Sequence, residues 1–258
     1  MGRTQVCYAP AMVRGRRPPL RPAAAPDVET ASEAYARRFG GPVGELLLDA
    51  QTTALRELLA PFPGASVLDV GGGHAQAAAP LAADGHRLTV TGSETSCRAR
   101  LDRLLPAGSF AFARAPLDAL PFPDGSFEVV VALRMLAHAP RWEALLGELC
   151  RVARDAVIVD YPPRSGLHRM ARGLFVLKWA IERDTRRYRT FAPGAMEGAF
   201  AALGWELAAE RRELFFPLVL HRLLRAPRLS GVVERAARGL GLTRRWGSPA
   251  LLRVRPRR

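Results

Sequence analysis

Lysine is almost absent from this chain, cysteine is scarce, and no apolar run is long enough to cross a bilayer. Arginine supplies all but one of the 38 basic residues. The three cysteines are far apart and odd in number, so neither a disulfide framework nor a metal site is indicated. No stretch approaches the roughly 18 apolar residues that a membrane-spanning helix needs. The opening residues lack the apolar segment of a signal peptide. Together these absences favour a globular protein of a reducing compartment, and we expect it in the cytoplasm.

Acidic residues become scarce in the C-terminal part of the chain. From residue 161 onward, 21 basic residues stand against 7 acidic ones, whereas residues 28–160 carry a small acidic excess. Codon bias of a GC-rich genome explains arginine in place of lysine, but it does not explain the loss of acids. A basic face for an anionic substrate, a nucleic acid or an anionic membrane surface is the functional interpretation. No basic patch interleaved with aromatics is visible, so a specific nucleic-acid partner is not expected.

The chain is long enough for one large domain with a sizeable core. Residues 1–27, rich in arginine, proline and alanine, are predicted to be a disordered basic tail, and residues 28–258 a single domain. Short β-rich runs alternate with helical periods between residues 65 and 161, which is typical of βαβ units and a parallel sheet. The predicted strands are 65–70, 87–92, 109–113, 127–133, 156–161, 206–215 and 250–254. The predicted helices are 45–59, 75–83, 95–105, 142–153 and 193–203.

The most informative stretch is Val67–Ala75, which reads as a strand, a glycine-rich turn and the start of a helix. Glycines let a backbone pass close to a ligand. Glu94 closes the next apolar run, about 20 residues further on, where an acid can accept hydrogen bonds from ribose hydroxyls. The pattern predicts a nucleoside-containing cofactor. The dinucleotide fingerprint fails, because its third small residue would fall on Gln76.

A second segment narrows the choice of cofactor. Asp118–Val130 has the sequence DALPFPDGSFEVV, and it is followed by the segments Leu136–Pro140 and Leu146–Val152. With Asp69 ahead of the turn, these motifs resemble the small-molecule class I S-adenosylmethionine (SAM) methyltransferases, of the type 11 or UbiE-like group. The resemblance covers roughly residues 30–160, and the spacing between the motifs also agrees.

This resemblance implies an α/β fold, with a doubly wound, seven-stranded, mostly parallel sheet whose last two strands form an antiparallel pair. Helical lid or cap insertions are expected at about 164–190, after the fifth strand, and at 217–246, between the sixth and seventh. The implied cofactor is SAM. The cofactor-binding residues that follow are Tyr35, Arg38, Asp69, Gly71, Gly72, Gly73, His74, Glu94, Thr95, Leu117, Asp118, Leu133 and Arg134. Two positions depart from the family pattern: Ala75 replaces its third glycine, and Pro116 stands where an acid often meets the adenine amino group.

The candidate catalytic residues are His138, just past the fourth predicted strand, and Tyr161, at the end of the fifth. Methyl transfer is an in-line displacement, so the protein mainly positions the acceptor. A general base is needed only if the acceptor carries its proton at neutral pH. His138 could instead be a packing or capping histidine, and Tyr161 a core tyrosine.

The sequence therefore predicts a SAM-dependent methyltransferase that acts on a small, lipophilic acceptor, such as a quinone-like, polyketide or sugar-lipid molecule. An RNA or protein methyltransferase that uses the basic C-terminal part is one alternative. A non-catalytic scaffold or a protein that contacts an anionic membrane surface is the other. The sequence leaves the oligomeric state open.

Overall fold

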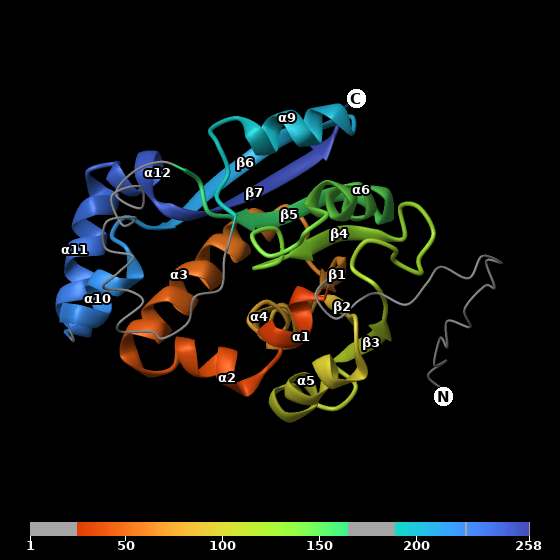
Figure 1. Ribbon diagram of the computed structural model, residues 1–258, viewed down its shortest axis with the longest axis horizontal. Helices are drawn as coiled ribbons and strands as arrows, with labels where there is room; N and C mark the ends of the chain where they lie inside the picture. Colours follow the sequence, from red (N-terminus) through yellow and green to blue (C-terminus); the bar gives the residue numbers. More distant parts are fainter. Residues whose placement is uncertain (1–24, 165–188, 225, 258) are drawn as a thin grey trace.

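A seven-stranded sheet organises the computed structural model, which describes residues 25–164, 189–224 and 226–257 (Figure 1). The strands are β1 (Ser66–Val70), β2 (Arg87–Gly92), β3 (Phe110–Arg114), β4 (Phe127–Ala132), β5 (Ala153–Tyr161), β6 (Trp205–Leu214) and β7 (Ser248–Pro256). Their order across the sheet is β3-β2-β1-β4-β5-β7-β6. The first five strands are parallel, and β7 is antiparallel to both β5 and β6. This arrangement confirms the predicted sheet.

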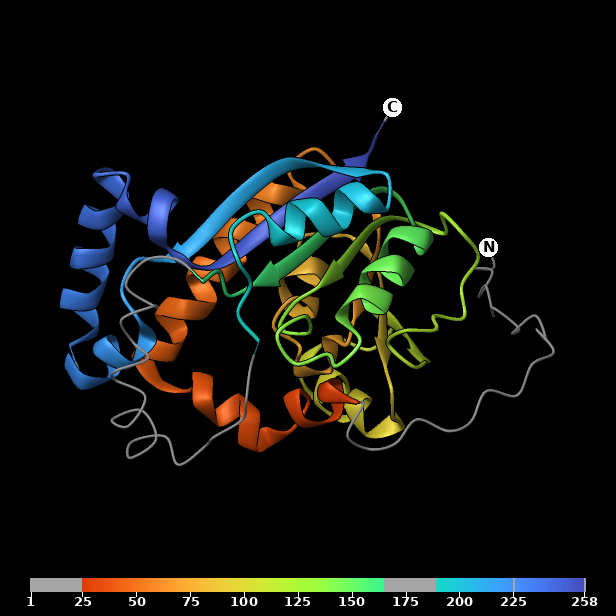
Figure 2. The same cartoon turned by 45° about the horizontal axis from the view of Figure 1, so that its top comes forward.

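Helices cover both faces of the sheet (Figure 2). The N-terminal elements are α1 (Pro26–Thr30), α2 (Glu33–Ala36), the 3-10 turn η2 (Arg37–Phe39) and α3 (Gly41–Leu59). Within the parallel part follow η3 (Gly72–His74), α4 (Ala78–Ala83), η4 (Thr95–Arg98), α5 (Ala99–Leu104) and α6 (Trp142–Val152). The C-terminal helices are α9 (Ala195–Ala202), α10 (Leu218–Leu224), α11 (Pro227–Gly239) and α12 (Leu242–Trp246). The last three lie between β6 and β7, where a helical insertion was expected.

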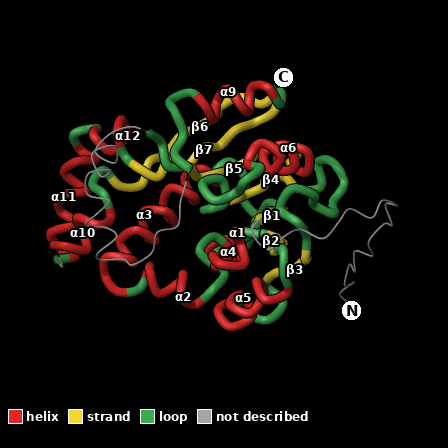
Figure 3. The backbone as a smooth tube through the Cα atoms, viewed as in Figure 1, coloured by secondary structure: helices red, strands yellow, loops and turns green. Residues whose placement is uncertain are grey.

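The core consists of two layers, because the central strands are buried on both faces. Alternate residues of β4 show the division: Val130 packs with α6 and α9, and Val129 packs with α3, α4 and α5. A strand covered on both sides reads as an unbroken apolar run, which is why β4 could be located from sequence. Because β1, β2, β4 and β5 run parallel, the loops that follow them lie at one edge of the sheet. Figure 3 shows the strands in yellow and the loops in green. Ligands of doubly wound sheets bind at this edge.

Several predicted boundaries are wrong. The expected disordered tail does not extend to residue 27, because Pro26 and Asp27 form the first turn of α1 and are part of the ordered domain. The helix expected at 75–83 begins only at Ala78, since Ala75 adopts a left-handed backbone conformation. The helix expected at 95–105 is divided into η4 and α5. Most of the lid predicted at 164–190 lies outside the described residues. Residues 1–24 of the predicted tail lie outside them as well.

No helix in the described part of the chain is both long and apolar enough to span a membrane.

Candidate active site

The turn after β1 brings its backbone into contact with buried atoms. A Cβ added at Gly72 would lie 2.1 Å from Oδ2 of Asp69, and one added at Gly73 would lie 2.6 Å from the carbonyl oxygen of Cys97. Neither neighbour can move away easily, since one is a fully buried side chain and the other is backbone. Only glycine therefore fits at these two positions.

Both ends of this turn adopt left-handed backbone conformations. The φ angle is +73° at Gly71 and +63° at Ala75. Alanine in this region is strained by its Cβ, at a cost of roughly 1 kcal/mol. Ala75 thus keeps the conformation that a glycine would adopt, and the departure from the family's third glycine leaves the shape of the turn intact.

Asp69 lies beneath the turn with its carboxyl group fully buried. Neither carboxyl oxygen has a hydrogen-bond partner among the described residues. Burial raises the pKa of this carboxyl to about 7. Buried polar groups in native proteins are nearly always paired, so the two unpartnered oxygens set Asp69 apart, and its assignment to the cofactor site stays a prediction.

His74 joins the glycine turn to the end of β4. Its Nδ1 accepts a hydrogen bond from the Gln76 backbone N–H at 3.1 Å, and its Nε2 lies 3.3 Å from the Leu133 carbonyl oxygen. This pattern places the proton on Nε2, which donates to Leu133. Burial, with the nearby Arg134 guanidinium, lowers the histidine pKa to about 4. The side chain is therefore neutral at physiological pH. It connects His74 to Leu133, and both are predicted cofactor-binding residues.

Helix α1 contacts the glycine turn and anchors the N-terminal segment at the end of β2. The Asp27 carboxylate is fully buried and accepts hydrogen bonds from the Ser93 backbone N–H at 2.6 Å and from its hydroxyl at 2.7 Å. The Sγ of Cys97 lies 3.5 Å from the same carboxylate. The role of Asp27 was not predicted from the sequence. The start of α1 could have been predicted, because a proline followed by an acid is typical of a helix N-terminus.

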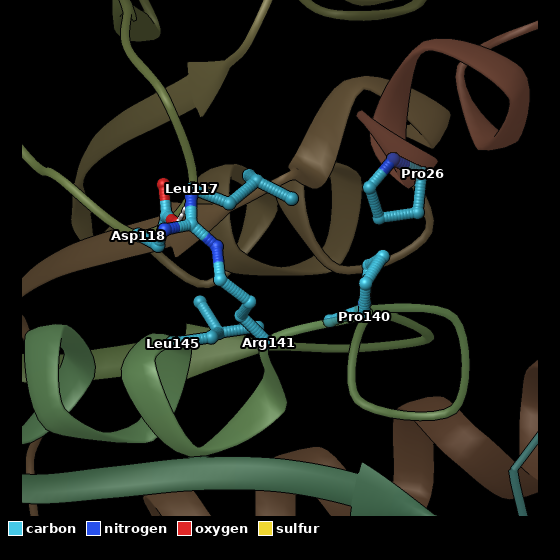
Figure 4. Close-up of a pocket in the computed structure, with 7 residues that line it drawn as sticks. Pro26, Leu117, Asp118, Pro140, Arg141 and Leu145 are labelled. Atoms are coloured by element: carbon cyan, nitrogen blue, oxygen red, sulfur yellow. Dashed lines mark ion pairs between the residues drawn. The ribbon is translucent and has the colours of Figure 1, made fainter. Parts of the chain in front are cut away.

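A pocket opens between α1, the loop after β3 and the start of α6 (Figure 4). Its lining residues are Pro26, Leu117, Asp118, Ala139, Pro140, Arg141 and Leu145. The walls are largely apolar, and the charged groups Asp118 and Arg141 form an ion pair with each other. The pocket contains two of the predicted cofactor-binding residues, Leu117 and Asp118.

Glu94 and Thr95 lie on the surface at the carboxyl end of β2. Glu94 stands at the N-cap of η4 without capping a backbone N–H, and its carboxylate accepts a hydrogen bond from the Ser96 hydroxyl at 3.3 Å. The residue before it, Ser93, is the one that Asp27 binds. The proposed ribose-binding acid is thus exposed, next to the anchor of α1, and its role stays a prediction.

Arg134 forms a buried polar cluster at the edge where β4 and β5 end. Its backbone φ is +61°, and its N–H donates to Oδ1 of Asp160. The guanidinium Nε donates to Oε1 of Gln76 at 2.8 Å, and Nη2 donates to Oε1 of Gln51 at 2.6 Å. The guanidinium carbon lies 4.6 Å from the centre of the Phe39 ring. Arg134 therefore links α3, the glycine turn and β5.

Glu213, on β6, completes what we call the Arg134 cluster: Arg134, Asp160, Glu213, Gln51 and Gln76. It is fully buried, and neither of its carboxyl oxygens has a hydrogen-bond partner in the described part of the chain. Burial raises its pKa to about 8, the Asp160 carboxylate adds to this shift, and Arg134 opposes it. Burial also raises the pKa of Asp160. Only Arg134 of this cluster was predicted from the sequence, since the two acids lie far from it along the chain.

The predicted N-terminal residues Tyr35 and Arg38 pack above this cluster. The Tyr35 ring lies 5.3 Å from that of Phe39, and the Arg38 guanidinium carbon lies 5.1 Å from the Tyr35 ring centre. Arg38 also approaches Glu29 of α1 at 3.8 Å. These helices cover the sheet edge where the loops after β1 and β4 meet.

The two candidate catalytic residues occupy different surroundings. Tyr161 is buried in the core layer of α6 and α9, 5.9 Å from the Phe191 ring centre. Burial, with Glu197 and Glu210, raises its pKa to about 12. Tyr161 therefore lies in the core, which was the alternative to a catalytic role. His138 is half-buried, and its backbone N–H donates to the Met135 carbonyl oxygen at 3.0 Å, directly before pocket residues Ala139 and Pro140.

A protein-family profile described as "Methyltransferase domain" matches residues 68–159 of the chain. This range begins within β1 and ends within β5, and it includes the glycine turn, Glu94, Asp118 and Arg134.

Relatives with known names agree with this match. An O-methyltransferase of Pyrenophora dematioidea is 30% identical over 116 residues, which cover 43% of this chain and 43% of that protein. The structure of magnesium protoporphyrin IX methyltransferase from Synechocystis PCC 6803, with bound S-adenosylhomocysteine (SAH), has a TM-score of 0.60 at 15% identity. It covers 87% of this chain and 93% of that one. A SAM-dependent methyltransferase from Thermotoga maritima has a TM-score of 0.58 at 13% identity, over 86% and 92% of the two chains. At these identities, the structures establish the fold alone.

Proposed function

We propose that this chain, which belongs to the class I SAM-dependent methyltransferases, transfers the methyl group of SAM to a small, lipophilic acceptor. The observation that carries the proposal is the glycine turn closed over Asp69, whose carboxyl oxygens are buried and unpartnered. A turn of this shape lets a ligand approach the backbone, and the acid beneath it can accept hydrogen bonds from the ligand.

The residues around the turn fit SAM part by part. The apolar walls of the pocket at Leu117 and Pro140 suit a flat, aromatic ring. The exposed carboxylate of Glu94, at the end of β2, suits ribose hydroxyls. Asp69 suits the donor groups at the amino-acid end of the cofactor. SAM supplies a methyl group activated by a sulfonium, so the chain itself needs to bind, orient and exclude water.

The relative from Pyrenophora acts, by its name, on an oxygen atom, and we extend this to a hydroxyl acceptor. A hydroxyl must lose its proton during the transfer. Tyr161 holds its own proton at neutral pH, because its pKa is about 12, so we assign it a packing role. His138 remains the proposed proton acceptor, since it directly precedes two residues of the pocket wall.

Calorimetric titration with SAM and SAH, with NADH as the control ligand, tests the proposed cofactor. We expect both adenosyl ligands to bind and NADH not to bind. Glu94→Ala should weaken both by roughly 10- to 100-fold, because hydrogen bonds to a charged group contribute about 1.5–3 kcal/mol. Glu45→Ala, which removes an exposed carboxylate on α3, is the matched control and should bind as the wild type does.

Two results would contradict the proposal. A folded wild-type protein that binds neither adenosyl ligand cannot be a methyltransferase of this kind, and the scaffold alternative would then apply. If SAM binds and Glu94→Ala binds it equally well, the cofactor stands, but the ribose role of Glu94 is wrong. A screen of phenols, catechols and other lipophilic hydroxyl compounds for SAH release then tests the acceptor.

A further inference from the structure

The helices between β6 and β7 expose their apolar side chains. Ten large apolar residues in the described ranges stand out as exposed, and seven of them belong to α10, α11 or the segment up to the end of α12. The seven are Leu220, Leu223, Leu224, Leu229, Val232, Leu240 and Trp246. Scattered apolar residues on a surface need no explanation, but a group on one small element marks an interaction site.

Helix α11 has its polarity inverted relative to an ordinary surface helix. The side chains that it buries are small or polar, namely Ser230, Glu234 and Ala237. Leu229 and Val232 on the helix, and Leu240 directly after it, are exposed. With Ala236, they follow one another at intervals of three and four residues, and so they form a single stripe along the helix. The helix thus docks on the protein by its polar side and leaves its apolar stripe outside.

The buried polar side of α11 has a structural purpose of its own. The Glu234 carboxylate accepts hydrogen bonds from the backbone N–H groups of Phe215 and Phe216, both at 2.9 Å. It also lies 2.9 Å from Nε2 of the fully buried His221, on α10. These contacts orient α10 and α11 on the end of β6, so the outward direction of the apolar stripe is a fixed feature of the fold.

The charge on this insertion has one sign. Residues 217–246 contain seven arginines, and their only acid is Glu234, which is buried. Arg228 and Arg235 lie seven residues apart on α11, two helical turns, and form a basic row beside the apolar stripe. Arg244 and Arg245 on α12 are exposed as well. Residues 217–246 therefore present exposed leucines and arginines but no exposed carboxylate of their own.

Charge complementarity selects the occupant. A second copy of the chain would bring two basic surfaces together, and like charges oppose that contact. A nucleic acid would satisfy the arginines but would leave the leucines in water. A bilayer that contains anionic lipid satisfies both, because apolar side chains enter the boundary between headgroups and acyl chains while arginines bind phosphates.

We propose that α10, α11 and α12 form a docking surface for anionic lipid bilayers. The three helices make up one edge of the molecule, on the opposite side from β3 (Figures 1 and 2). Docking by this edge leaves the pocket between α1 and α6 away from the contact. The inference does not depend on methyl transfer, and it is tested without cofactor or acceptor.

Co-sedimentation of the full chain with vesicles tests the docking surface. We expect binding to vesicles of phosphatidylcholine mixed with phosphatidylserine, and at least about tenfold weaker binding to pure phosphatidylcholine. The double variant Arg228→Glu/Arg235→Glu should lose roughly tenfold or more in affinity for the anionic vesicles. The double variant Leu229→Ser/Leu240→Ser keeps every charge and should also lose about tenfold.

A matched control changes the same residue types elsewhere: Leu104→Ser/Arg114→Glu removes an exposed leucine and an exposed arginine near the opposite edge. It should bind anionic vesicles as the wild type does. Circular dichroism of every variant checks folding. Equal loss in the control, or wild-type protein that does not sediment with anionic vesicles, would overturn the proposal.

Two further results identify other occupants and also overturn it. If the leucine variant keeps its affinity and only the arginine variant loses it, the surface binds an anionic polymer or an acidic protein by charge alone. If sedimentation velocity without vesicles shows a dimer that the leucine variant dissociates, the apolar stripe belongs to an interface between copies.

Discussion

Asp69→Asn is expected to stabilise the folded protein and at the same time to weaken its binding of SAM. The carboxyl has a folded-state pKa of about 7, raised by burial from its ordinary value of 3.8. Such a group stabilises the fold below its unfolded pKa, and this stability is lost as the pH rises through the folded pKa. At pH 8 the asparagine variant should therefore unfold with a free energy higher by on the order of 4 kcal/mol, whereas near pH 4 the two proteins should be alike.

The same substitution removes a charged acceptor from the cofactor site. Loss of a hydrogen bond to a charged group costs about 1.5–3 kcal/mol, so we expect SAM affinity to fall by roughly 10- to 100-fold. Urea denaturation at several pH values and calorimetry with SAM measure the two effects. Opposite signs are the signature of a group kept for function at the expense of stability.

Asp49→Asn provides the matched control, because Asp49 is exposed on α3. It should change neither the pH dependence of stability nor the affinity for SAM. An Asp69→Asn protein that is less stable than the wild type at pH 8 would show that Asp69 has a structural partner and would contradict its assignment to the cofactor site.

Local patterns in the sequence were sufficient for the sheet and for the glycine turn. The apolar run of β4 and the glycines at 71–73 carry their meaning within a few residues, because strand burial and turn geometry depend on near neighbours. Ala75 is the exception, because it was expected to begin a helix and instead has the left-handed backbone conformation of a glycine. The confirmed parts of the fold are those whose determinants lie close together in the chain.

The determinants of the site lie further apart. Asp27 belongs to α1 through its hydrogen bonds to Ser93, 66 residues away, and the composition around it indicated a disordered tail. Tyr161 could not be assigned to a face of the sheet, because β5 is buried on both sides and shows no alternation. Only the tertiary structure places it in the core while its neighbour Asp160 reaches Arg134.

The members of the Arg134 cluster are also far apart along the chain, so the cluster could not be predicted from the sequence. Replacement of Arg134 is the second change for which we expect a large effect on stability. Arg134→Met is expected to destabilise the protein by about 3–5 kcal/mol at neutral pH, because it leaves the buried Asp160 carboxylate without its cation and Gln51 and Gln76 without their donor. Methionine keeps a Cβ and a similar length, so the backbone strain at this position is unchanged. Urea denaturation measures the loss, and Arg114→Met, at an exposed position on β3, should stay within about 0.5 kcal/mol of the wild type.

Glu213→Gln should act in the opposite direction. The folded-state pKa of Glu213 is about 8, raised from 4.5, so the wild type loses stability relative to the glutamine variant as the pH rises from about 5 to 8, by about 1.4 kcal/mol per pH unit. Arg134 lowers the pKa of Glu213, and Glu213 is about half ionised at pH 8, so the double variant should recover roughly 0.4 kcal/mol beyond the sum of the single changes at that pH. The recovery should be smaller at pH 5, where Glu213 is protonated in every variant. Strict additivity at both pH values would mean that the two side chains do not interact, and that Glu213 is destabilised by burial alone.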